Sequence, residues 1–368
     1  MLTNWPLDLL ALALLTGCGS PGTPMGPPPG PDDERPADAD ELPLTEAEHP
    51  PPDAEQPASS PRVPLPTGWI AAAEPPESGC IPTGPCVDDY LALPERLGRA
   101  RVTTRSALNG TLSEILRTAS PDGPAEPPAL PLDELQRILF AGAALDGLLP
   151  TADPAVRVLA TFEVDGLTVQ RLLLEDPLLG RIDAVLALAP KPRGVVLGLH
   201  GHGEPEDSFL LERHGLALAR AGWTVLAPRQ RAYLDGASES EASYHLLEHG
   251  MTLMGAEIAE SLRWLRWLRL QHGQAPVLIG HSGGAAIALF ASTIDPSVRG
   301  VIVDGTPQLT NWSEEGIADE TLPALVPYRW SVTNLQRTFV PTRSLSDELN
   351  AELPVAALLT ALDSLGTP

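Results

Sequence analysis

One serine in the chain stands in a setting that favours a reactive hydroxyl. Residues 280–284 are Gly-His-Ser-Gly-Gly, which matches the pattern G-x-S-x-G with Ser282 at its centre. The preceding residues 276–279 predict a strand, and the alanine-rich residues 285–291 predict a helix. A serine on such a tight strand-to-helix turn projects its hydroxyl, provided that the residues two before and two after it are small. We therefore expect Ser282 to be the nucleophile of an acyl-transfer reaction.

A second glycine-rich turn is expected to form an oxyanion hole. The apolar strand predicted at residues 195–199 is followed by His-Gly-His-Gly at 200–203. Acyl transfer needs backbone N–H donors directed at the developing oxyanion. We expect one donor from Gly283, directly after the nucleophile, and the other from this earlier loop, with His202 as the favoured residue. The alternative is a simple glycine-rich turn without a chemical role.

The segments that must position these turns alternate between strands and helices. Residues 156–164 and 167–174 predict a β-hairpin around Asp165-Gly166. Further strands are expected at 182–189, 195–199, 223–227, 275–279, 298–303 and 339–345, and helices at 214–221, 251–271, 283–293 and 351–365. Repeated β-α units predict an α/β protein with a doubly wound, mostly parallel sheet. We assign residues 150–368 to this domain and residues 78–149 to a small, mainly helical flanking region.

The stretch from about 155 to 365 resembles an α/β-hydrolase of the branch that contains dienelactone hydrolases and acetyl xylan esterases. The resemblance is carried by 199–203, 280–284, the helix at 251–270 with the preceding 245–249 segment, and the strand that ends in Val303-Asp304-Gly305. It implies hydrolysis of a small-molecule or carbohydrate ester by a Ser-His-acid triad, with no metal ion and no organic cofactor.

The acid and the base of this triad are less clear than the nucleophile. Asp304 ends the strand after the nucleophile's helix, where some relatives carry the acid, and we favour it. Asp347 follows the poorer strand at 339–345, at the more common acid position. The family order places a histidine last. The eight histidines, however, lie at positions 49, 200, 202, 214, 245, 249, 272 and 281, so none follows Ser282.

Three explanations for the missing histidine are open. The gene is truncated or frameshifted and the domain lacks its last β unit; a histidine from another segment, such as His202 or His249, substitutes; or the protein is a pseudoenzyme that binds without turnover. A serine without a base is a poor nucleophile at neutral pH, so activity would be impaired. The expected function is a serine hydrolase of carboxylic esters, and the alternative is a non-catalytic binding protein on the same fold.

The N-terminus predicts export and lipid anchoring. Residues 7–15 are apolar apart from Asp8 but too few to span a membrane, and Leu15-Thr16-Gly17-Cys18 resembles a bacterial lipobox. We assign residues 1–17 to a lipoprotein signal peptide, with Cys18 as the lipidated residue. Residues 1–17 lack Lys and Arg, which a misassigned start codon would explain. Residues 18–77 are a disordered tether, since 19–66 hold 15 of the 41 prolines and no aromatic residue.

Charge and cysteine content agree with a location in the bacterial cell envelope, facing the periplasm or the cell surface. The net charge of −24 without a basic cluster argues against nucleic acid and leaves the lipid anchor as the expected membrane contact. Cys80 and Cys86 close a short Pro- and Gly-containing loop and are expected to form a disulfide in an oxidising compartment. Two thiols without a nearby histidine do not make a metal site.

Overall fold

The computed structural model describes residues 87–118, 132–140, 148–204, 208–232, 236–304, 312–313, 316–317, 342–346 and 355–365. All of them belong to one compact unit, Arg62–Pro368. The predicted signal peptide and tether lie outside the described residues, as do Cys18, Cys80, Cys86 and Asp347. No described helix is both long and apolar enough to cross a bilayer.

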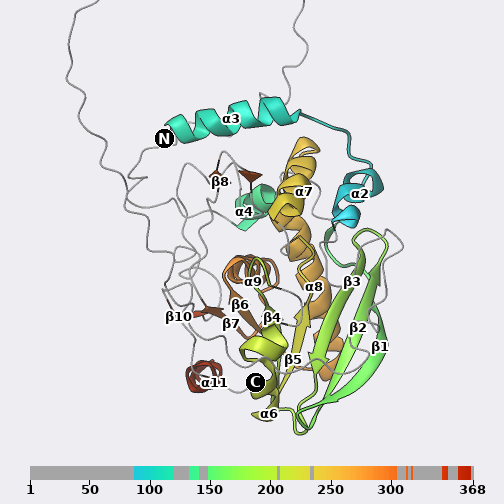
Figure 1. Ribbon diagram of the computed structural model, residues 1–368, viewed down its shortest axis with the longest axis vertical. Helices are drawn as coiled ribbons and strands as arrows, with labels where there is room; N and C mark the ends of the chain where they lie inside the picture. Colours follow the sequence, from blue (N-terminus) through green and yellow to red (C-terminus); the bar gives the residue numbers. More distant parts are fainter. Residues whose placement is uncertain are drawn as a thin grey trace, which may run out of the picture. The chain divides into compact units, whose positions relative to one another are not determined.

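The centre of the fold is an eight-stranded sheet, accompanied in the described residues by one two-stranded ribbon (Figure 1). The sheet strands are β1 (Ala155–Val164), β2 (Leu167–Asp176), β3 (Gly180–Ala187), β4 (Gly194–Leu199), β5 (Trp223–Pro228), β6 (Val277–His281), β7 (Gly300–Asp304) and β10 (Thr342–Ser346), and the ribbon strands are β8 (Trp312–Ser313) and β9 (Gly316–Ile317). The order in the sheet is β1-β2-β3-β5-β4-β6-β7-β10. Strands β5, β4, β6, β7 and β10 are parallel, and β1 to β3 are antiparallel. The predicted doubly wound, mostly parallel α/β sheet is confirmed.

The strand order reverses at β4. The chain passes from β4 to β5 on one side and then returns to β6 on the other side of β4. In open α/β sheets, ligands bind outside the carboxyl ends of the strands where the order reverses in this way. The two turns predicted to carry the nucleophile and the oxyanion hole follow β4 and β6. Because these parallel strands are neighbours, the turns lie side by side at the carboxyl end of the sheet.

The predicted hairpin is present. Strands β1 and β2 pair in antiparallel fashion around Asp165 and Gly166, which have φ values of 51° and 75°. Positive φ at both central residues is what a type I′ turn requires, and Asp-Gly tolerates it better than most pairs.

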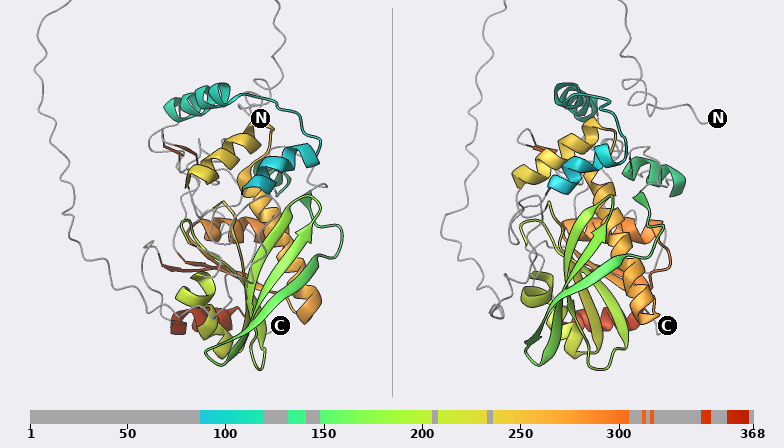
Figure 2. Two further views of the ribbon diagram at one scale, coloured as in Figure 1. Left: turned by 45° about the vertical axis from the view of Figure 1, so that its right-hand side comes forward. Right: turned by 90° about the vertical axis from the view of Figure 1, so that its right-hand side faces the viewer.

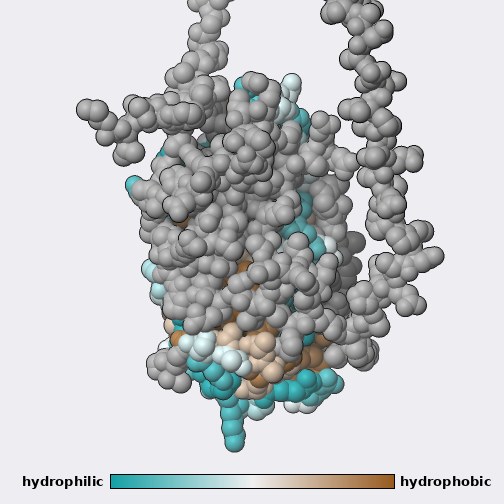
Figure 3. Space-filling view, turned by 90° about the vertical axis from the view of Figure 1, so that its left-hand side faces the viewer, coloured by the Kyte–Doolittle hydropathy of each residue, from teal (hydrophilic) through white to brown (hydrophobic). Residues whose placement is uncertain are grey.

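Helices cover both faces of the sheet (Figure 2). They are α2 (Asp88–Arg96), α3 (Arg105–Thr118), α4 (Leu132–Leu139), the π-helix η1 (Phe209–Arg213), α6 (Gly215–Arg220), α7 (Gly236–Glu248), α8 (Leu253–His272), α9 (Gly283–Ile294) and α11 (Val355–Ser364). Helices α8 and α9, with α2 and α4, share one hydrophobic cluster with the sheet, whereas η1, α6 and α11 share the other. Figure 3 shows hydrophobic residues gathered near the lower end of one side of the molecule, at the height where Figure 1 places α11.

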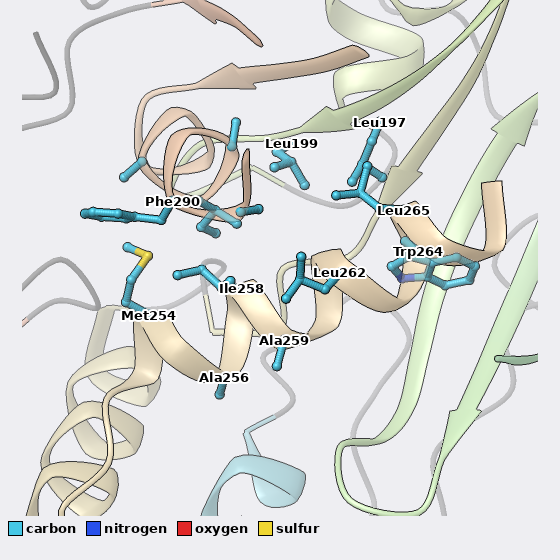
Figure 4. Packing of buried hydrophobic residues seen from close by; sticks show 14 of the residues in the cluster. Leu197, Leu199, Met254, Ala256, Ile258, Ala259, Leu262, Trp264, Leu265 and Phe290 are labelled. Atoms are coloured by element: carbon cyan, nitrogen blue, oxygen red, sulfur yellow. The ribbon is translucent and has the colours of Figure 1, made fainter. Parts of the chain in front are cut away.

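Helix α8 forms the larger core because one stripe of it is apolar. Met254, Ile258 and Leu262 repeat every four residues and point toward Phe290 of α9 and Leu199 of β4 (Figure 4). The helix boundaries are set by its caps. The Thr252 side chain accepts a hydrogen bond from the Gly255 N–H at the start, and Gly273 adopts φ 65° at the end.

The predicted helical flanking region contains α2, α3 and α4 within its described residues. Leu108 and Leu112 of α3 pack against Tyr244 and Leu247 of α7. Helix α7 was not predicted, because its sequence has little apolar periodicity. In the structure it packs against α2 and α3, among other elements.

Candidate active site

Ser282 occupies a strained turn between β6 and α9. Its φ of 50° and ψ of −122° make it one of two non-glycine residues with positive φ among those described, the other being Asp165 in its hairpin. Such backbone strain costs of the order of 1–3 kcal/mol and persists where the surrounding structure enforces it. Ser282 is partly exposed, whereas the residues on either side of it are buried. The turn thus presents one side chain from a buried segment.

The two outer glycines of the motif are required by close backbone approach. A Cβ on Gly280 would lie 2.5 Å from the Cα of Ala285 and 2.6 Å from the carbonyl carbon of Gly284. A Cβ on Gly284 would lie 2.5 Å from the carbonyl oxygens of Leu199 and His200. Helix α9 therefore sits directly against β6 and β4, as the G-x-S-x-G pattern predicted for this strand–turn–helix unit.

The loop after β4 contacts the turn that carries Ser282. A Cβ on Gly201 would lie 3.0 Å from the Cβ of Ser282 and 2.9 Å from Cδ2 of His281. Gly203 has φ 74° at the third position of a turn in which the Glu204 N–H donates to the Gly201 carbonyl at 3.4 Å. Gly283 begins α9, so its N–H is among the first helix amides, which have no acceptor within the helix. The loop with His202 and the turn with Gly283 are thus neighbours.

His200 and Gln230 hold this loop, a role that sequence reasoning missed. His200 is fully buried, and its Nε2 accepts a hydrogen bond from the Gln230 backbone N–H at 3.0 Å. The proton of the neutral ring must then be on Nδ1, which donates to the Gly201 carbonyl at 3.0 Å. The Gln230 side-chain amide donates to the His200 carbonyl at 2.6 Å. No local sequence signal links two residues 30 positions apart.

Asp304 ends β7 next to Ser282. Its backbone carbonyl accepts the Ser282 N–H at 3.0 Å, and its carboxylate Oδ2 lies 3.2 Å from Nδ1 of His281. The carboxylate is buried and lies 4.0 Å from Nη1 of Arg213. Strand β10 pairs Ser346 with Asp304, and Asp347, the other candidate acid, lies outside the described residues.

The other candidate histidines have partners of their own. Nε2 of His202 lies 3.2 Å from Oε1 of Glu239 on α7. His249 directly follows α7, donates from Nδ1 to the His245 carbonyl at 2.8 Å, and places its ring 4.6 Å from the His245 ring. His202 and His249, the two histidines considered as a substitute base, thus each have a partner that lies outside the turn around Ser282.

Glu204 and Arg213 complete the polar surroundings and were also missed. Arg213 donates from Nε to Glu204 at 3.1 Å and from Nη2 to its other oxygen. Burial by itself raises the pKa of Glu204, but the hydrogen bond and charge of Arg213, with His281 and the Gly201 amide, lower the pKa below its ordinary value. Within the described residues, no three His, Cys, Asp or Glu side chains are grouped so that they could hold a metal ion.

Residues 194–362 match the family model for the alpha/beta hydrolase fold. This protein has the α/β-hydrolase fold. The matched range begins with β4 and contains both turns described above, together with α9, β7 and β10.

Two solved structures illustrate the likeness. One is a protein of Bacteroides fragilis NCTC 9343 assigned as an acetyl xylan esterase, with 14% identity, a TM-score of 0.47, and coverage of 66% of this chain and 75% of that one. The other is acetyl xylan esterase 1 from Thermoanaerobacterium sp. JW/SL YS485, with 15% identity, a TM-score of 0.41, and coverage of 68% and 87%. No curated protein matches the chain in sequence. At these identities, neither protein's substrate transfers to this chain.

Proposed function

We propose that this protein is a serine hydrolase of carboxylic esters, with Ser282 as its nucleophile. The observation that carries the proposal is the backbone of Ser282, which holds φ at 50° on a turn where Gly280 and Gly284 are sterically required. Structural strain of this kind at a non-glycine residue concentrates at functional sites. A serine retained in this conformation without a chemical role would carry a cost in stability and no benefit.

The reaction would follow the acyl-transfer sequence. Oγ of Ser282 attacks the ester carbonyl carbon, and its proton passes to solvent water, since no histidine follows Ser282 in this sequence. The N–H groups of Gly283 and His202 stabilise the resulting oxyanion. The alcohol leaves with a proton, and water then hydrolyses the acyl-serine to release the acid. Asp304 is the proposed acid of the site. A small-molecule or carbohydrate ester is the proposed substrate class.

A second candidate function is a binding protein that has lost turnover. The specific observation in its favour is His281, the histidine beside Ser282. Its Nδ1 faces Asp304 at 3.2 Å and its Nε2 faces Glu204 at 3.8 Å, so both ring nitrogens are directed at carboxylates. A serine site without a base retains only the small catalysis that the oxyanion hole and binding supply. We therefore expect slow turnover even if Ser282 is reactive.

A fluorophosphonate probe separates the two functions. Wild type should become labelled and Ser282→Ala should not, while Ser292→Ala, a serine elsewhere in the same helix α9, should label as wild type does. Turnover of p-nitrophenyl acetate that disappears in Ser282→Ala supports the hydrolase. Absence of both labelling and turnover in folded wild type would refute it and leave the binding protein.

We also propose that the chain is a lipoprotein of the bacterial cell envelope, cleaved before Cys18 and lipidated there. Metabolic labelling with an alkyne fatty acid should mark wild type and not Cys18→Ala. The proposed disulfide between Cys80 and Cys86 predicts no free thiol at either position in protein exported without its lipid. Two reactive thiols at these positions would contradict that pairing.

A further inference from the structure

A bracket of four charged or titratable side chains surrounds the nucleophile turn: Glu204, Arg213, His281 and Asp304. They come from the loop after β4, from η1 and from the ends of β6 and β7. Their side chains are 20%, 26%, 10% and 6% exposed, so the bracket is largely removed from water. Charged groups so placed need specific partners to offset their desolvation.

Glu204 is the member that reaches the oxyanion loop. Its Oε2 accepts the Gly201 backbone N–H at 3.2 Å and the Ser208 hydroxyl at 3.2 Å. Arg213 binds both carboxylate oxygens through Nε and Nη2. A bidentate guanidinium fixes the plane of the carboxylate as well as its position. The carboxylate therefore holds the Gly201 amide in one place.

Gly201 is also the residue that touches the nucleophile. Its α-carbon faces Ser282 so closely that an added Cβ would lie 3.0 Å from the Cβ of Ser282. A displacement of the Gly201 peptide would therefore move the loop that carries the His202 amide relative to the serine. Oxyanion donors lose most of their effect when they leave the position of the developing charge.

The other two members of the bracket, His281 and Asp304, lie next to Ser282. His281 immediately precedes Ser282, and its ring lies between Asp304 at 3.2 Å and Glu204 at 3.8 Å. Asp304 also accepts the Ser282 N–H through its backbone carbonyl. The contacts thus join the loop after β4 to the turn after β6 through side chains rather than through sheet hydrogen bonds alone.

We propose that Glu204, held by Arg213, is a positioning residue that fixes the oxyanion loop against the nucleophile turn. The proposal rests on the proposed hydrolase function for its catalytic consequence. Its structural part, that Glu204 holds the loop after β4 in place, can be measured by hydrogen exchange without any activity assay. Glu204 does not contact the reacting atoms in this account; it acts through Gly201.

The test compares Glu204→Ala, Glu204→Gln and the control Glu241→Ala by hydrogen exchange. Glu241 is a carboxylate on α7 that is 53% exposed and pairs with Arg105 at 2.6 Å. In Glu204→Ala, the backbone amide hydrogens of peptides covering 199–204 should exchange at least about 10-fold faster than in wild type. A change of this size is within the range that local opening produces in folded proteins. Glu204→Gln keeps an oxygen that can accept the Gly201 N–H, so it should restore part of the protection. Glu241→Ala should match wild type in this segment.

The catalytic consequence is a slower attack by Ser282. Glu204→Ala should reduce the fluorophosphonate labelling rate by about 100-fold, the order found when one oxyanion donor is lost. KM for p-nitrophenyl acetate should stay unchanged while kcat falls, which a merely structural role would not produce. Arg213→Met should show the same pattern.

The outcomes are distinguishable from those for the proposed function. Unchanged exchange at 199–204 in folded Glu204→Ala overturns the positioning role, whatever the activity. Faster exchange spread evenly over all the sheet strands also overturns it, since it indicates global destabilisation. If wild type is not labelled at all, the hydrolase proposal fails, and the exchange experiment still decides whether Glu204 fixes the loop.

Discussion

The close approach of helix α9 to β6 in the turn around Ser282 can be tested by adding one methyl group at Gly280. The new Cβ would meet backbone atoms of Gly284 and Ala285 at 2.5 to 2.6 Å. This is about 1 Å closer than the separation at which carbon atoms attract each other. Backbone atoms of a helix cannot rotate away as a side chain can, so α9 as a whole must move from β6. Overpacking of this kind costs about 3 kcal/mol in the free energy of unfolding.

Gly280→Ala should therefore lower stability and slow the reaction together. Urea unfolding followed by circular dichroism should show a free energy of unfolding about 3 kcal/mol below that of wild type. Among molecules that remain folded, fluorophosphonate labelling of Ser282 should fall by about 100-fold, since a 1 Å misplacement of reacting groups has that order of effect. The labelling rate is measured at a temperature where both proteins are fully folded.

The same substitution in open space is the control. Gly110 lies in α3, and a Cβ added there meets nothing within 4 Å. Gly110→Ala should raise stability by up to about 1 kcal/mol through helix propensity and leave labelling unchanged. A Gly280→Ala protein with wild-type stability and labelling would refute the argument that the glycines of this motif are required by close approach of α9.

Two buried arginines and their carboxylate partners give further predictions. Arg231 is buried between Glu260 of α8 and Asp89 of α2. Arg231→Met leaves Glu260 buried without its cation, whereas Asp89 keeps its pair with Arg96, and it should cost about 3–5 kcal/mol in urea unfolding. Burial raises the pKa of Asp176, but the hydrogen bond and charge of Arg263, together with the backbone N–H groups of Leu178 and Leu179, more than reverse this, and the net pKa is lowered. A folded-state pKa below the unfolded value adds stability above about pH 4 that is lost as pH falls through the folded pKa. Asp176→Asn should thus cost about 2 kcal/mol at pH 7 and much less near pH 2.5, measured by denaturation at both pH values.

One exposed pair serves as the control for both. Arg220 and Asp165 lie 2.7 Å apart with about half of each side chain exposed. Arg220→Met and Asp165→Asn should each change stability by less than about 1 kcal/mol. If the exposed and buried substitutions lowered the free energy of unfolding equally, burial would not be what makes the buried pairs important. If the loss in Asp176→Asn did not depend on pH, the lowered pKa assigned to Asp176 would be wrong.

Local features of the fold were predictable from the sequence because their causes are local. The Asp165-Gly166 hairpin follows from two residues that tolerate positive φ, and the structure has the turn there. Helix α8 was expected at 251–271 and spans Leu253–His272, since its apolar stripe and its Gly273 stop are both encoded nearby. The strand at 339–345 is present as β10, shifted to Thr342–Ser346. Helix α7 was missed because its packing partners are distant in the chain.

The spacing of Gly280, Ser282 and Gly284 is enough to predict the strand–turn–helix motif, since it is a steric requirement of one short turn. The sequence also indicates the α/β class through the alternation of apolar strands and helices. The surroundings of the serine, in contrast, depend on how distant parts of the chain pack together. The strand order around β4 brings Gly201 against Ser282 and places Glu204 and Arg213 beside it, and these contacts join residues dozens of positions apart that have no local signature. Side-chain partners across a sheet depend on which strands are neighbours, and that is settled when the whole core packs.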